Sequence, residues 1–172
     1  IEKLIKGCSA IGFGCGMGDN DDTYNKLGYI LKNTTCPIII DADGLNVLKN
    51  KKELLEKNQD RIIITPHLGE MARLTGYSIN YIRDNKIDVA KEFANKYKVV
   101  VLLKGYETVI TNGKYTYINP TGNSAMANGG MGDTLLGMIT SFVGQGMTNL
   151  MGTVCAAYIH GYIGETLSKD LY

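Results

Sequence analysis

Residues 37–46 read PIIIDADGLN, an apolar run that ends in acidic and polar residues. An uninterrupted apolar segment of this kind is typical of a strand that is buried on both faces of a parallel sheet. Residues 61–65 and 99–103 have the same character, and residues 8–12 form a shorter candidate strand. These strands alternate with helical patterns along the chain. We therefore expect an α/β sandwich with a largely parallel central sheet.

Helical patterns occupy the segments between and after the strands. Asn112-Gly113 lies between two further strand candidates, Thr108–Thr111 and Tyr115–Ile118, and is a typical hairpin turn. At 172 residues the chain is long enough for one core, so we treat residues 1–172 as a single domain. The first predicted helix begins after the capping carboxylates at 19–22 and ends at about residue 31. A short helix follows and ends at residue 49, and the remaining predicted helices cover residues 69–74, 84–97, 132–143 and 148–167.

The composition excludes several classes of protein. A net charge of +1 provides no electrostatic footprint for nucleic acid or for an anionic membrane surface. No apolar run is long enough to span a bilayer, and no signal peptide is visible. The four cysteines are scattered and the chain has two histidines, which argues against a zinc site and against a disulfide framework. We expect a cytoplasmic protein with neither a nucleic-acid nor a membrane partner.

Unusual residues follow four of the predicted strands. They form the segments GFGCGMG (12–18), DADGLN (41–46), TPHLGE (65–70) and KGYET (104–108). In open α/β sheets, ligands bind beyond the carboxyl ends of the strands. We therefore expect these four segments to surround one ligand site.

A glycine-rich stretch provides a candidate anion site. Residues 123–142 read NSAMANGGMGDTLLGMITSF, in which glycines precede an apolar helical pattern. Glycine lets the backbone approach a ligand closely, and the free N–H groups at a helix N-terminus favour an anion. Asp133 lies in the first turn of this helix, where it is either a helix-starting carboxylate or a base beside a bound phosphate.

The other candidate residues have open alternatives. The glycines of residues 12–18 form either a surface for a flat ligand or a simple turn from strand to helix. Asp41 and Asp43 bind substrate hydroxyls, bind a cation, or cap the next helix. His67 either donates to a polar ligand or caps its own helix. Lys104 ends an apolar strand, where its ammonium group could meet a phosphate.

These motifs occur together and in one order. The set comprises IGFGCGMG (11–18), DADGLN, ITPHLGEMARLTG (64–76), VVLLKGYETVI (100–110), NPTGNSAMANGGMGDTLLGMI (119–139) and HGYIGE (160–165). Because it contains this ordered set of motifs, the chain resembles the ADP- or ATP-dependent NAD(P)H-hydrate dehydratases, which are ribokinase-like metabolite-repair enzymes. The resemblance implies a ribokinase-like three-layer α/β/α sandwich with a mostly parallel sheet. It also implies that further strands and helices of the domain precede Ile1, so that the N-terminal part of the domain is missing here.

The resemblance implies a lyase that acts on the S epimer of hydrated NADH or NADPH. The added hydroxyl is phosphorylated, with ADP expected before ATP as the donor, and elimination of phosphate restores NADH or NADPH and leaves AMP. Magnesium is expected to accompany the nucleotide, and we assign no protein ligand to it. The expected partners are the NAD(P)H hydrate and an adenine nucleotide. Members of the family commonly form homo-oligomers, so we expect one here.

The resemblance also implies roles for individual residues. Asp133 would deprotonate the substrate hydroxyl, and the family usually has Leu where this chain has Cys15. The implied substrate-binding residues are Gly16, Asp43, Asn46, His67 and Asp133; the implied anion hole is Gly130, Met131 and Gly132; and the implied nucleotide-binding residues are Lys104, Gly105, Tyr106, Glu107, Thr108, Gly130 and Gly132.

Two other functions remain open at this point. A ribokinase-like small-molecule kinase, for example one that resembles hydroxyethylthiazole kinase, shares the glycine-Asp133 arrangement. The DADGLN and TPHLGE segments together favour the dehydratase. A non-catalytic nucleotide-binding fragment is the second alternative, and the presence of Asp133 and Lys104 argues against it.

Overall fold

The computed structural model describes residues 1–171 and contains one six-stranded sheet with the order β1-β2-β3-β4-β5-β6. Strands β1 to β4 are parallel, and β5 and β6 continue the sheet in antiparallel pairing. The mostly parallel sheet confirms the expected α/β architecture. The strands are β1 (Ile11–Phe13), β2 (Ile38–Ile40), β3 (Ile62–Ile64), β4 (Val100–Leu103), β5 (Val109–Thr111) and β6 (Thr116–Ile118).

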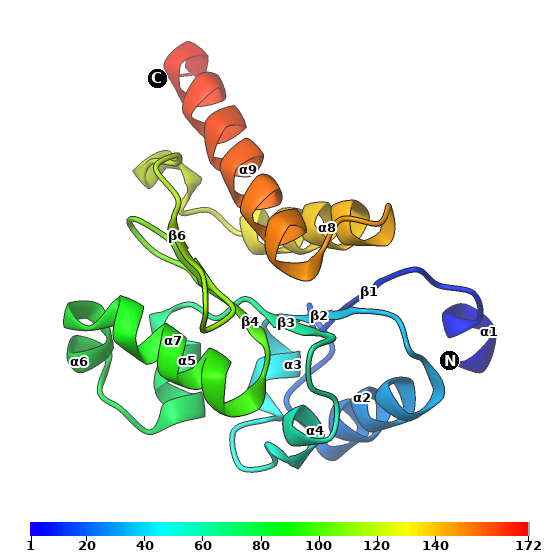
Figure 1. Ribbon diagram of the computed structural model, residues 1–172. Helices are drawn as coiled ribbons and strands as arrows, with labels where there is room; N and C mark the ends of the chain where they lie inside the picture. Colours follow the sequence, from blue (N-terminus) through cyan, green and yellow to red (C-terminus); the bar gives the residue numbers. More distant parts are fainter. Residues whose placement is uncertain (172) are drawn as a thin grey trace.

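Helices cover both faces of the sheet, so that the domain has three layers (Figure 1). A short helix α1 (Glu2–Ile5) precedes β1, and a 3₁₀ turn η1 (Ser124–Met126) precedes α8. One face carries α2 (Asp21–Asn33), α3 (Asp43–Asn46), α4 (Glu53–Glu56), α5 (Leu68–Thr75), α6 (Ile79–Asp84) and α7 (Lys86–Tyr97), and the other face carries α8 (Met131–Gly144) and α9 (Asn149–Leu171).

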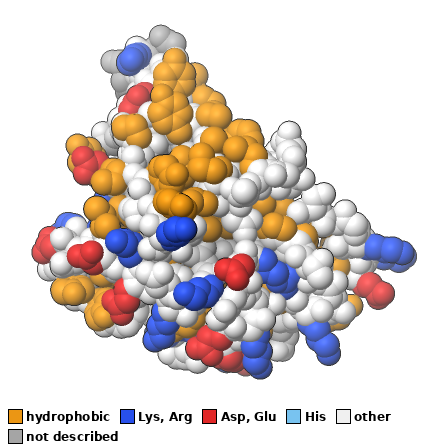
Figure 2. All heavy atoms as spheres, viewed as in Figure 1, with side chains coloured by type: hydrophobic (Ala, Val, Ile, Leu, Met, Phe, Trp, Pro, Cys, Tyr) orange, Lys and Arg blue, Asp and Glu red, His pale blue; other side chains and the backbone are white. Residues whose placement is uncertain are grey.

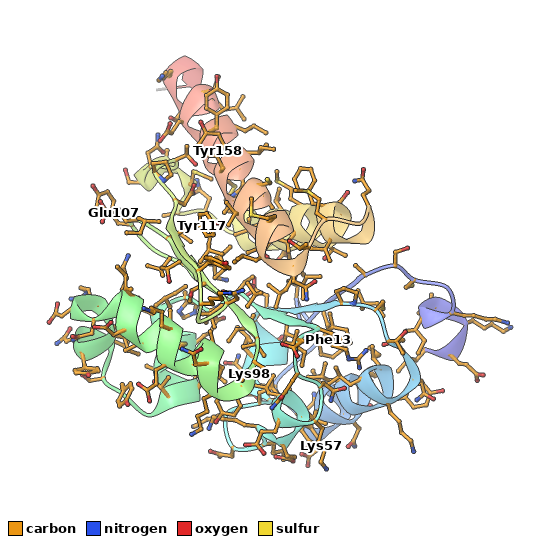
Figure 3. The ribbon with its side chains drawn as sticks, in the orientation of Figure 1. Phe13, Lys57, Lys98, Glu107, Tyr117 and Tyr158 are labelled. Carbon is orange, nitrogen blue, oxygen red and sulfur yellow. The ribbon has the colours of Figure 1, made fainter. Side chains whose placement is uncertain are left out.

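The isoleucine triplets of β2 and β3 explain why both faces need cover. The two triplets pair residue for residue, and all six side chains are fully buried. Because successive side chains of a strand point to opposite faces, Ile38 and Ile40 pack with α2 to α7, and Ile39 packs with α8 and α9. Phe13 of β1 belongs to the first of these two cores (Figure 3). An apolar run without alternation therefore produced a doubly covered strand, as expected.

Several boundaries differ from the sequence-based prediction. The helix expected at 84–97 is interrupted at Asn85, which ends α6 and precedes α7. Ile87 continues the apolar spacing on which the helix at 84–97 was predicted, but it is 40% exposed. Helix α2 is capped by the side chain of Asn20, which accepts a hydrogen bond from the Thr23 amide, and not by an aspartate. The first strand begins at Ile11 and not at residue 8.

The predicted hairpin is confirmed. Strands β5 and β6 pair in antiparallel fashion around Asn112-Gly113, and Gly113 has a φ of +88°. The Asn112 side chain accepts hydrogen bonds from the amides of Lys114 and Tyr115. This local bonding accounts for the strong turn signal in the sequence.

Helix α9 projects beyond the rest of the molecule toward its C-terminal end (Figure 1). Apolar side chains on this projecting part are exposed to solvent, and Figure 2 shows apolar atoms gathered over the same part of the molecule. No helix within the described residues is long and apolar enough to cross a bilayer. The exposed apolar side chains of the projecting part of α9 are Tyr158, Ile159, Tyr162, Ile163 and Leu167.

Candidate active site

An ion pair joins the ends of β2 and β4. The ammonium nitrogen of Lys104 lies 2.7 Å and 3.0 Å from the two carboxylate oxygens of Asp41. A carboxylate oxygen of Glu70, in the first turn of α5, lies 3.9 Å from the same nitrogen. The Asp41 and Glu70 side chains are 4% and 7% exposed, and that of Lys104 is 23% exposed. Charges buried to this extent require partners, and here they provide them for one another.

The backbone around Asp41 is tightly constrained. A side chain on Gly14, whose φ is +122°, would lie 1.9 Å from the carbonyl oxygen of Asp41. Ala42 has a φ of +47°, which is uncommon for any residue other than glycine, and its amide donates to the Asp41 side chain at 2.8 Å. Strain of this kind persists only where the surroundings hold it, and it is concentrated at functional sites. The glycine segment 12–18 therefore packs against the chain's own loop 41–44.

The N-terminus of α8 lies beside this ion pair. A Cβ atom built on Gly132 would lie 3.6 Å from a carboxylate oxygen of Asp41 and 3.8 Å from the ammonium nitrogen of Lys104. Gly130 precedes the helix with a φ of +88°, and no side chain caps it. Within residues 1–171 we find no hydrogen-bond partner for the amides of Gly132 and Asp133. Free amides at a helix N-terminus are suited to an anion, so an anion site here stays a prediction.

Asp133 is exposed in the first turn of α8, as the sequence predicted. Cys15, in the loop after β1, lies against it. The pKa of the Cys15 thiol is raised to about 12, first by burial, then by its hydrogen bond to Asp133 and by the negative charges of Asp133 and Asp41, with Lys104 acting in the opposite direction. The thiol therefore stays protonated at neutral pH beside the Asp133 carboxylate.

His67 caps helix α5. Its Nδ1 atom accepts hydrogen bonds from the amides of Gly69 and Glu70 at 2.9 Å and 3.3 Å, and Glu70 in return accepts from the His67 amide at 2.7 Å. This arrangement is a capping box. The His67 side chain is still 53% exposed, and its Nε2 atom lies 3.4 Å from a carboxylate oxygen of Glu70. Of our two alternatives, the local cap is confirmed, and a ligand contact stays a prediction.

The remaining predicted substrate residues connect neighbouring loops. Asp43 accepts a hydrogen bond from the Gly18 amide at 2.8 Å, which joins α3 to the loop after β1. Asn46 accepts from the Arg73 guanidinium at 2.9 Å, which joins α3 to α5. No side chain among the described residues caps α3, so neither Asp41 nor Asp43 has the capping role that we considered. Gly16 is exposed in its loop with a φ of +66°.

The predicted nucleotide-binding segment forms an exposed loop between β4 and β5. Tyr106 is 87% exposed, and Figure 3 shows Glu107 at the edge of the molecule beside the hairpin. Gly105 has a φ of +149° and Glu107 one of +54°. The Thr108 hydroxyl donates to the carbonyl of Gly105 at 3.0 Å. Lys104 is turned inward to Asp41, while residues 105–108 face outward.

Sequence reasoning missed the pairing of Lys104 with Asp41 and Glu70. We expected Lys104 to meet a phosphate, and Asp41 to bind substrate hydroxyls, bind a cation or cap the next helix. A signal was available, because Asp41 and Lys104 each directly follow a fully apolar strand of one parallel sheet. This places both charges at one edge of the sheet, but the packing of the sheet decides that they meet. Within the described residues, no group of three or more His, Cys, Asp or Glu side chains could hold a metal ion.

The sheet order and the glycine-led helix beside the strand ends define the class of ribokinase-like α/β proteins. The model of a family described as NAD(P)H-hydrate dehydratase matches residues 2–172 of the chain. The chain therefore belongs to the NAD(P)H-hydrate dehydratase family, as the resemblance in the motifs suggested.

Named relatives agree with the family. The chain is 37% identical to the ADP-dependent (S)-NAD(P)H-hydrate dehydratase of Staphylococcus aureus, over 100% of this chain and 61% of that protein. It is 35% identical to the bifunctional NAD(P)H-hydrate repair enzyme Nnr of Moorella thermoacetica, over 99% of this chain and 32% of that protein. The chain thus spans about a third to three fifths of the length of these relatives.

A solved structure agrees as well. The crystal structure of the ADP/ATP-dependent NAD(P)H-hydrate dehydratase from Bacillus subtilis, co-crystallized with ATP and Mg²⁺, superposes with a TM-score of 0.81 at 32% identity. The match covers 94% of this chain and 57% of that one. The similarity therefore extends over the strands, the strand-end loops and α8 together.

Proposed function

We propose that this chain is part of an ADP-dependent (S)-NAD(P)H-hydrate dehydratase, a hydro-lyase that repairs damaged nicotinamide nucleotides. In the reaction ADP becomes AMP and phosphate, and the hydrate of NADH or NADPH loses water. The observation that carries the proposal is the arrangement at the N-terminus of α8. There the exposed Asp133 carboxylate, the free amides of Gly132 and Asp133, and the Lys104–Asp41 pair lie together.

Asp133 is suited to the first proton transfer. Its carboxylate lies in the first turn of α8, exposed to the space into which a substrate hydroxyl would come. It accepts the hydroxyl proton while the oxygen takes the phosphoryl group from the nucleotide. The phosphate ester then loses phosphate, and the ring double bond is restored. The protonated Cys15 thiol lies beside this carboxylate.

The amides at the start of α8 are suited to the transferring phosphoryl group. That group spreads negative charge over its outer oxygens in the transition state, and preorganised N–H donors stabilise such charge. Gly130, Met131 and Gly132 form the turn that presents these donors. Because Gly130 adopts a left-handed conformation and carries no side chain, the turn stays open to a ligand.

Lys104 has one donor left for a phosphate. A lysine ammonium has three N–H groups, and Asp41 accepts from it with both carboxylate oxygens. The Glu70 oxygen at 3.9 Å is beyond hydrogen-bonding distance. The remaining N–H is thus available near Gly132, where we place the phosphoryl group. Asp41 holds the ammonium group in this position.

The residues present fit an adenine nucleotide and a magnesium ion that arrives with it. Free helix-terminal amides and the spare Lys104 donor match phosphate oxygens. Magnesium is usually held by one or two carboxylates together with substrate phosphates, so a dedicated cluster is not needed. When bound, the ion would neutralise phosphate charge, and we assign no protein ligand to it.

We place the protein in the cytoplasm as a homo-oligomer. The support for the compartment is that Cys8, Cys15, Cys36 and Cys155 are all free thiols. The support for self-association is the apolar side chains that α9 exposes near Tyr158. Sedimentation of the purified protein tests the second statement, and a monomer at micromolar concentration would contradict it.

The experiment that tests the proposed function is an absorbance assay at the reduced-nicotinamide band. The protein is mixed with hydrated NADH and Mg²⁺, with ADP, with ATP or without nucleotide. We expect a rise in absorbance with ADP, a weaker one or none with ATP, and none without nucleotide. A protein that binds and consumes nucleotide only with another alcohol substrate would be a small-molecule kinase instead.

A further inference from the structure

Lys86 connects the start of α7 to the loop between β4 and β5. Its ammonium nitrogen donates to the backbone carbonyl of Tyr106 and, at 2.9 Å, to that of Glu107. These are two consecutive carbonyls of the loop 105–108, which carries our predicted nucleotide-binding residues. Lys86 itself is about 20 residues away in the sequence and lies on a different element.

The helix does not explain why a lysine occupies this position. Lys86 is the first residue of α7, where a positive charge opposes the helix dipole. Burial lowers the pKa of the Lys86 ammonium group, while the charge of Glu107 opposes this shift. The helix dipole and burial therefore both disfavour a charged lysine here. The hydrogen bonds to the two loop carbonyls compensate for this cost. Lys86 therefore stabilises the loop and not the helix.

The two carbonyl contacts also determine where the loop amides point. In a planar trans peptide the C=O and the following N–H point in opposite directions. With the carbonyls of Tyr106 and Glu107 directed at Lys86, the amides of Glu107 and Thr108 are directed away from it. Within the part of the chain that the structure describes, the Glu107 amide has no hydrogen-bond partner, and the Thr108 amide closes a turn toward the Gly105 carbonyl. Successive amides in a turn that contains a left-handed residue form a concavity that binds anions.

We propose that Lys86 is a positioning residue for the nucleotide: by holding the carbonyls of Tyr106 and Glu107, it presents the amides of Glu107 and Thr108 to a nucleoside diphosphate. This inference rests on the proposed function and adds a residue outside the loop to the nucleotide site. The break between α6 and α7 at Asn85 belongs to the same arrangement, because it makes Lys86 the first residue of a new helix.

The test compares Lys86→Met, Lys86→Arg and the control Lys91→Met in the whole protein. Lys91 is on the same helix, and no partner is found for it within the described residues. Calorimetry measures the affinity for ADP, and steady-state kinetics measures the KM for ADP and for the hydrate. Hydrogen exchange measures the protection of residues 104–109 in the free protein. Thermal unfolding checks that each variant folds.

For Lys86→Met we expect ADP to bind about ten- to a hundredfold more weakly, from the loss of two charge-assisted hydrogen bonds. The KM for the hydrate should stay within about threefold, and exchange in the loop should accelerate. Lys86→Arg should retain most of the affinity, and Lys91→Met should match the unaltered protein. A purely structural role would lower the melting temperature without changing the KM for ADP selectively.

Unchanged ADP affinity in a folded Lys86→Met variant would overturn the inference. If the unaltered protein binds no ADP, the proposed function fails, and the exchange measurement still decides the role of Lys86. In that case, unchanged exchange of residues 104–109 in Lys86→Met would show that the lysine does not hold the loop.

Discussion

Helices α5 and α8 begin on either side of Lys104, and they differ in capping: the N-terminus of α5 is capped by side chains and that of α8 is not. At α5 the His67 side chain accepts from two amides of the first turn, and Glu70 completes the capping box. At α8 the preceding residue is Gly130, no side chain caps the helix, and two amides are left without a partner among residues 1–171. The capped end contributes to stability, whereas the uncapped end is available to a ligand.

The difference shows how one sheet edge can combine rigidity with binding. The buried carboxylates of Asp41 and Glu70 and the capped start of α5 hold Lys104 in one position. The unsatisfied groups are concentrated on the opposite side, at the start of α8. A binding site needs such donors to be free before the ligand arrives, and their neighbours to be fully satisfied so that the site keeps its shape. The following predictions test this division.

The largest effect is expected at the uncapped end. Asp133→Asn should lower turnover by roughly two to four powers of ten, because the amide cannot accept the substrate proton. Nucleotide affinity and melting temperature should change little, since the side chain is exposed. Single-turnover kinetics measures the turnover, and calorimetry measures the nucleotide affinity. Asp88→Asn, in the exposed first turn of α7, is the matched control, and near-normal turnover in Asp133→Asn would remove this residue from the mechanism.

The second effect is expected at the ion pair between the two helices. Lys104→Met should destabilise the fold by about 3 kcal/mol, because the Asp41 carboxylate is left buried without its cation. It should also weaken ADP binding. Adding Asp41→Asn to this variant should restore part of the stability but not the affinity, as chemical denaturation and calorimetry would show. Restored affinity in the double variant would mean that the lysine contributes no donor to the phosphate.

A third prediction compares glycines at opposite ends of two helices. Gly130 precedes α8 and Gly76 ends α5, with φ values of +88° and +84°, and a Cβ at either position would meet no atom within 4 Å. Alanine at each position should cost a similar 1–2 kcal/mol or so of stability from backbone strain. Only Gly130→Ala should also weaken ADP binding, because it disturbs the free amides. Equal affinity in the two variants would contradict the anion site at α8.

The smallest effect is expected at the capped end. His67→Ala should cost about 1 kcal/mol, since the cap of α5 is lost, and His67→Asn should retain most of that stability. If the exposed ring edge contacts the hydrate, both variants should raise its KM several-fold. Thermal unfolding and steady-state kinetics separate the two roles. An unchanged KM in His67→Asn would reduce His67 to a helix cap.

Much of the fold was predictable from local patterns. The fully apolar segments became the buried parallel strands, and Asn112-Gly113 became the hairpin turn. The helix break at Asn85 was not predicted, because the apolar spacing continues across it. In the structure Asn85 ends α6 locally, and its side chain donates to the Tyr81 carbonyl at 2.9 Å. In the site, the sequence placed Asp133 in the first turn of a glycine-led helix, and the structure confirms that position. The roles of the site residues stay predictions.

By itself, the sequence determined which segments are buried and which residues follow each strand, because burial on both faces and turn chemistry are encoded in neighbouring residues. Only the tertiary structure decided the partner of each polar group. Asp41 and Lys104 are 63 residues apart, and their pairing depends on β2 and β4 ending at the same edge of the sheet. Lys86 meets the loop carbonyls because α7 packs along β4 and β5. Such pairings follow from how elements pack, which no local pattern encodes.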